Sequence, residues 1–140
     1  MTPGEYEYFD AAPAVGLAAW GPDLPGCLRQ CALGVFNLIV ATGAVEARES
    51  REVAARGASV EALLVNWLNE CIYVHDLEGF VVSDVARPEV TSTGVHAVLH
   101  GEPVDPARHP RGTVVKAATY HGLEVRETPG RVTARIVLNI

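Results

Sequence analysis

GEPVDPARHPRGTVVKAATYHGLEV, residues 101–125, is the stretch that carries the strongest local signals of the chain. Each of its three prolines fixes φ at about −65° and lacks a backbone donor, which argues against a regular helix or a central strand there. Asp105 before a proline is typical of a helix N-cap and predicts one helical turn through Arg108. The β-branched residues of 113–120 predict a strand, and Gly122 predicts a bend or bulge in it.

This arrangement separates two groups of polar side chains along one rigid stretch. Arg108, His109 and Arg111 are expected at the loop end, and His121 and Glu124 are expected at the other end of the strand. Both groups are therefore candidates for a functional surface.

Hydrophobic periodicity predicts two helices and several more strands in the rest of the chain. Apolar residues at helical spacing favour helices over residues 24–41 and 60–74, with Ser59 as the cap of the second. Strands are predicted over 5–10, 14–20, 50–56, 80–85, 94–100 and 131–140. This order predicts an α+β fold in which two helices pack on one face of a mixed sheet of about six or seven strands.

Length and composition favour one globular domain over residues 1–140. No apolar run approaches the length of a transmembrane helix. The three cysteines lack the spacing of a disulfide framework, which favours the cytoplasm.

The charge balance bears on the kind of partner. A formal net charge of −6 argues against direct, strong binding of nucleic acid through its phosphates. A local basic patch of Arg108, Arg111 and Lys116 stays compatible with that balance. If the protein works near RNA, the charge favours contact with a protein partner.

Two sets of side chains suggest chemistry. Cys27 and Cys31 share a helix face and, with His75, could contribute to a zinc site. No CxxC pair supports such a site. The favoured interpretation is that both cysteines are small, buried apolar side chains. His121 with Glu124 or Asp105 is the one plausible acid/base set, which leaves a small hydrolase as an alternative. A histidine before glycine at a strand bend is more often structural or partner-facing than catalytic. No nucleophile elbow, zinc-protease helix or phosphate-binding glycine loop is present.

Four segments, residues 51–53, 63–70, 101–109 and 115–125, together resemble the archease family. The resemblance spans nearly the whole chain, and its most specific part is Lys116 followed by Thr119-Tyr120-His121-Gly122-Leu123. It implies a small cytoplasmic protein that is not itself an enzyme. Archeases are cofactors of the GTP-dependent RNA ligase RtcB, whose guanylylation and turnover they promote in tRNA splicing and RNA repair. The resemblance makes His121, Arg108, His109, Lys116 and Asp105 candidates for the surface that meets such a ligase.

The chain departs from this family where a metal is expected. The resemblance implies a divalent cation held by two aspartates and the terminal backbone, at the positions of Ala14 and of Asn139 with Ile140. Archeases also resemble one another in an N-terminal His-Thr-Ala-Asp-apolar-Gly segment, which aligns with residues 11–16 here, so that Ala11 stands at the family's histidine position. Because Ca²⁺ prefers anionic oxygen ligands, we expect this site to bind it weakly or not at all, with partial compensation from Asp10 and the Ile140 carboxylate. No other cofactor is expected, and a metal-free binding module with a different partner is the second hypothesis.

Overall fold

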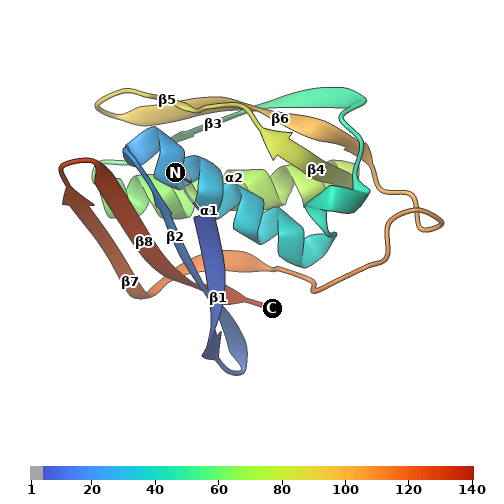
Figure 1. Cartoon of the computed structure of the whole chain (residues 1–140), viewed down its shortest axis with the longest axis horizontal. Helices are drawn as coiled ribbons and strands as arrows, with labels where there is room; N and C mark the ends of the chain where they lie inside the picture. The colour runs from blue at the N-terminus through green and yellow to red at the C-terminus, as the bar shows by residue number, and fades with distance from the viewer. Residues whose placement is uncertain (1–4) are drawn as a thin grey trace.

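The computed structural model describes residues 5–140, which form eight strands and two α-helices. In chain order the elements are β1 (Glu5–Ala11), β2 (Ala14–Gly21), α1 (Leu24–Ile39), a short 3₁₀ turn (Thr42–Ala44), β3 (Glu49–Arg56), α2 (Val60–Glu78), β4 (Phe80–Val85), β5 (Glu89–Val90), β6 (Gly94–Pro103), β7 (Ala117–Thr128) and β8 (Arg131–Asn139). Figure 1 shows their arrangement, with the loop between β6 and β7 at the opposite end of the molecule from the β7–β8 hairpin.

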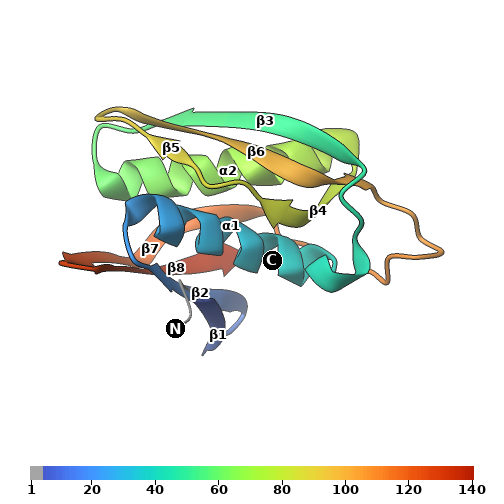
Figure 2. The ribbon, with the colours of Figure 1, turned by 45° about the horizontal axis from the view of Figure 1, so that its top comes forward.

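The elements form three layers, with the two helices between two sheets (Figure 2). One sheet has the strand order β1-β2-β8-β7, and the other has the order β3-β6-β4 with β5 also paired to β6. The α+β class predicted from the sequence is confirmed. The single mixed sheet is corrected to two sheets in which every strand pair is antiparallel. The physical reason lies in α1, which is buried around much of its circumference and so needs a layer on each side.

Several element boundaries differ from the sequence prediction. α2 continues to Glu78 and ends at Gly79, whose φ of 64° is the left-handed conformation of a helix C-cap. Strand β7 begins at Ala117 rather than at residue 113. The bend at Gly122 is confirmed, because φ there is 63° and the pairing of β7 with β8 is interrupted between Thr119 and Glu124.

Loop backbone explains why residues 113–116 do not join the strand. Gly112 and Thr113 donate their N–H groups to the carbonyls of Ile39 and Leu38, at 2.9 and 2.7 Å. These carbonyls belong to the last turn of α1, where no further helical N–H group is available to donate to them. The loop therefore caps α1.

The core fills the helical layer. Trp67 of α2 is fully buried, and its indole Nε1–H donates to the carbonyl of Leu28 in α1 at 3.0 Å. Cys27 and Cys31 are buried free thiols, as the sequence analysis favoured. Within residues 5–140, neither helix is both long and apolar enough to cross a membrane.

Candidate functional site

The loop between β6 and β7 is fastened to the fold by one buried carboxylate, Glu102. This side chain is 2% exposed and lies next to the end of β6. Arg108 donates to it in a bidentate arrangement, from Nη2 to Oε1 at 2.7 Å and from Nη1 to Oε2 at 3.2 Å. The backbone N–H of Glu46 also donates to Oε2 at 2.7 Å. A charged side chain is rarely buried without such partners, and here they join three separate segments.

His109 completes this cluster from the interior. The backbone N–H of Asp105 donates to its Nδ1 at 2.8 Å, and its Nε2 lies 3.1 Å from Oε2 of Glu102. Because an N–H must meet an acceptor and a carboxylate must meet a donor, the arrangement selects the neutral imidazole with the proton on Nε2. His109 is fully buried, so its side chain holds the loop and does not lie on the exposed surface where the sequence analysis placed it.

Asp105 begins the loop turn as predicted. Its carboxylate accepts the N–H of Ala107 at 3.0 Å, and its carbonyl accepts the N–H groups of Arg108 and His109. The helical segment is limited to this single hydrogen-bonded turn. Asp105 and the partly exposed Arg108 therefore lie together, with Glu102 between them and the core.

We expect Glu102 to make folding sensitive to acid. The guanidinium of Arg108 and the N–H of Glu46 lower the pKa of Glu102 from 4.5 to about 2. Because the unfolded chain binds this proton more readily, the stabilisation is complete above the ordinary pKa and is lost as the pH falls from about 4.5 to about 2. Urea unfolding of the wild type and Glu102→Gln across this range should show a difference in stability that shrinks as the pH falls. A difference that stays constant with pH would contradict the assignment.

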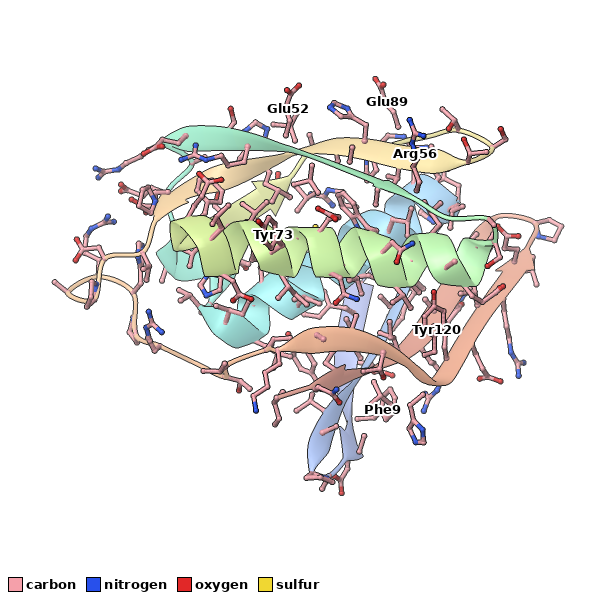
Figure 3. All side chains as sticks on the ribbon, turned by 180° about the vertical axis from the view of Figure 1, so that it is seen from behind. Phe9, Glu52, Arg56, Tyr73, Glu89 and Tyr120 are labelled. Carbon is pink, nitrogen blue, oxygen red and sulfur yellow. The ribbon has the colours of Figure 1, made fainter. Side chains whose placement is uncertain are left out.

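A second site, which we call the hairpin groove, lies beside the turn between β1 and β2. It is a hollow of about 790 Å³ between that turn, the bulge of β7 and the end of β8. A smaller hollow of about 230 Å³ adjoins it and shares Pro13, Ala14 and Asn139 with it, and we include this smaller hollow in the hairpin groove. Figure 3 shows Phe9 at the bend of β7, with Tyr120 on the opposite side of that bend.

Strand register brings the residues of this groove together. Val15 pairs with Leu138, so Ala14 and Asn139 form the next position along the two strands. Asn139 also pairs with Ala117 of β7, and its carbonyl accepts the N–H of Lys116 at 2.7 Å. Lys116 consequently lines the smaller hollow with Asn139 and Ile140.

The groove does not fit the divalent cation that the sequence resemblance implies. Among the described residues that line the two hollows there is no Asp or Glu side chain, and the polar groups include Lys116, His121 and Arg135. Asp10 does not line either hollow, and its Oδ1 accepts the N–H of Ala12 at 3.1 Å. Ca²⁺ requires several oxygen ligands, most of them anionic, and cationic side chains oppose its entry.

The acid/base set considered from the sequence is not assembled. Asp105 is engaged in the loop, whereas His121 lines the hairpin groove at the bulge of β7. Glu124 lies 3.4 Å from Arg126 instead. No hydrogen bond joins the side chains of these three described residues, so the hydrolase alternative has no hydrogen-bonded pair to build on.

Two residues of these sites, Glu102 and Arg135, were not predicted from the sequence. Glu102 was visible only as part of a matching segment, although a carboxylate followed within seven positions by Arg108 and His109 is a signal for an ion-paired cluster. Arg135 was not singled out. Its guanidinium carbon lies 4.0 Å from the ring centroid of Phe9, a contact that depends on the β1-β2-β8 register.

Comparison with known proteins places this geometry in a family. The model of the Archease protein family matches residues 6–140. The chain is 34% identical to Protein archease of Pyrococcus abyssi over 139 residues, covering 96% of this chain and 98% of that protein. It is 36% identical to Protein archease of Thermococcus gammatolerans over 136 residues, covering 94% and 96%. The solution structure of a Methanobacterium thermoautotrophicum protein superposes with a TM-score of 0.78, at 29% identity and full coverage of both chains. The chain therefore belongs to the archease family.

Proposed function

We propose that this protein is a cofactor of an RtcB-type, GTP-dependent RNA ligase in the cytoplasm. It stimulates the ligase by promoting its guanylylation, and so keeps it turning over in tRNA splicing or RNA repair. The observation that carries the proposal is the family match over residues 6–140. The proposed role requires contact with the ligase and no catalytic residue of this chain's own.

The charge distribution supports action through a protein partner. The chain has a net charge of −6, so its overall field repels the phosphates of RNA. The side chains proposed to meet the ligase are the exposed Lys116 and His121 at the hairpin groove, and the partly exposed Arg108 and Asp105 at the loop. His109 contributes indirectly, because it holds the loop in place.

Multiple-turnover RNA ligation tests the proposal. The ligase of the same organism is supplied with GTP, Mn²⁺ and excess RNA ends, with and without this protein, and both ligated RNA and guanylylated ligase are measured. We expect stimulation of both. The variants Lys116→Gln and His121→Ala should reduce it by about tenfold if each removes a contact of about 1.4 kcal/mol. Arg131→Gln changes an exposed arginine that does not line the groove and should retain full stimulation.

A specific observation favours one competing function. The groove lacks the carboxylates that the metal-binding members of the family are expected to have, so the scaffold fits a metal-free binding module with a different partner. Absence of stimulation from folded protein and active ligase would reject the ligase role in favour of this second function. A genome without a neighbouring ligase gene would point the same way.

A further inference from the structure

We propose that the hairpin groove binds a polyphosphate chain, free or as part of a nucleotide, in place of a divalent cation. This inference goes beyond the proposed ligase role, because it concerns a ligand of this protein alone. It starts from the mismatch between the groove and a metal site.

Unused donors line the groove. The side chains of Lys116, His121, Arg135 and Asn139 make no hydrogen bond or ion pair with any other described residue. Ammonium, guanidinium, imidazole and amide groups all donate hydrogen bonds, and charge-assisted bonds to phosphate oxygens are among the strongest available. The groove thus offers donors in a place where the family pattern would offer acceptors.

Stacking on the ring of Phe9 orients the guanidinium of Arg135 for binding a phosphate oxygen. Its guanidinium lies over the ring of Phe9, which itself covers Gly16 so closely that an added Cβ there would lie 2.2 Å from the ring. A stacked guanidinium keeps its N–H edge free for an oxyanion while losing little further freedom on binding. The arginine is consequently held at one side of the groove.

The spacing of the donors selects an extended anion. Arg135 and Asn139 are four residues apart on β8, which places them about 13 Å apart along the strand. Lys116 lies beside Asn139 at the far end. A chain of two or three phosphates fits this length better than a single phosphate, and a hollow of about 790 Å³ is within the range of small-molecule sites.

Several acidic groups lie near these donors and reduce the local positive charge without removing the donors. The carboxylate of Ile140 shares the smaller hollow with Lys116 and offsets part of its charge. Glu7 pairs with Ala18, which pairs with Arg135, so this exposed carboxylate lies two strands from Arg135 and does not line the groove. Glu124 pairs with Arg135 in strand register, but its carboxylate lies 3.4 Å from Arg126, which offsets its charge. The carboxylate of Asp10 is turned to the backbone of the turn. More distant acidic residues are screened over about 8 Å at physiological salt.

Calorimetric titration with tripolyphosphate in magnesium-free buffer tests the proposal. We expect saturable binding of one molecule to the wild type, and an affinity about 100-fold weaker in Lys116→Gln/Arg135→Gln, since each lost charge-assisted contact accounts for about tenfold. Arg131→Gln is the matched control, because Arg131 lies on the same strand and face and stacks on Trp20, outside the groove. Equal binding by the double variant and the wild type, or no saturation in the millimolar range, would overturn the proposal. So would micromolar binding of Ca²⁺ to the wild type.

Comparison of GTP, GMP and tripolyphosphate identifies the source of the phosphates. Tighter binding of GTP than tripolyphosphate indicates a nucleotide, and equal binding of the two indicates recognition of the polyphosphate alone. GMP should bind weakly in either case. A short single-stranded RNA that binds more tightly than tripolyphosphate would overturn the proposal in favour of a nucleic-acid backbone.

Restoring the carboxylates should reverse the preference. The variant Ala14→Asp/Asn139→Asp places two carboxylates at neighbouring positions, and we expect it to gain Ca²⁺ binding and lose tripolyphosphate binding. Retention of tripolyphosphate affinity by this variant would contradict the assignment.

Amide chemical shifts of the wild type provide a second readout that needs no variant. They should move around Gly122 and Asn139 on addition of tripolyphosphate, and shifts confined to other regions would reject the site.

Discussion

Replacement of Trp67 by alanine is expected to lower the free energy of unfolding by about 3–5 kcal/mol, the range measured for large aromatic side chains in cores. Trp67 is fully buried and belongs to the helical layer that both sheets cover. Its loss leaves a cavity between α1 and α2, and it leaves the carbonyl of Leu28 without the indole N–H that it accepts at 3.0 Å. Because natural domains are stable by about 5–15 kcal/mol, this loss is a large fraction of the total.

Two further variants separate the causes of that loss. Trp67→Phe keeps much of the ring and removes the indole donor. The Leu28 carbonyl keeps its hydrogen bond within α1, so the variant should cost about 1–2 kcal/mol for one lost hydrogen bond and a smaller ring. Trp20→Ala is the matched control, since Trp20 lies on the outer face of its sheet, is only half-buried and has Arg131 over its ring. Urea unfolding followed by circular dichroism measures all three. A cost for Trp67→Ala no greater than for Trp20→Ala would show that the helical layer is not the main core.

The same tryptophan illustrates what sequence patterns could predict. Trp67 belongs to an apolar stripe at helical spacing, and the structure places that stripe in the buried face of α2. Such spacing depends only on the 3.6-residue period of a helix, so it is visible without tertiary information.

The first residue of strand β7 could not be predicted in the same way. Residues 113–116 have high β-propensity, but Thr113, together with the preceding Gly112, donates its N–H to α1, and the first contact with β8 is made by the N–H of Lys116.

The candidate sites show a stricter limit of sequence reasoning. His121 and Lys116 were identified from local sequence patterns and Asn139 from the family resemblance, and the structure places all three at the adjoining hollows beside the β1–β2 turn. Their neighbour Arg135 was not identified, because its contact with Phe9 depends on the register of three strands that are distant in sequence. The division of strands between two sheets was likewise hidden, since local patterns give strand positions but not which strands pair.

Replacement of Glu102 by glutamine is expected to release the loop between β6 and β7. The amide that replaces the carboxylate has only one oxygen, which cannot accept the Glu46 N–H and both N–H groups of Arg108 together. Its NH₂ group also faces donors, among them Nε2 of His109. We expect the midpoint of thermal unfolding to fall by about 5–10 °C, a typical size for loss of a buried ion-pair network in a domain of this length.

Hydrogen exchange should localise the effect of this variant. Exchange should accelerate at the N–H groups of Arg108 and His109, and at those of Gly112 and Thr113 that cap α1. Glu124→Gln is the matched control, because that exposed carboxylate pairs only with exposed Arg126 and should change neither quantity. If Glu102→Gln and Arg108→Gln act through one shared contact, the double variant should cost less than the sum of the two single variants. Additive costs, or exchange that stays slow across the loop, would mean that the loop is held by its backbone contacts to α1 rather than by the buried carboxylate.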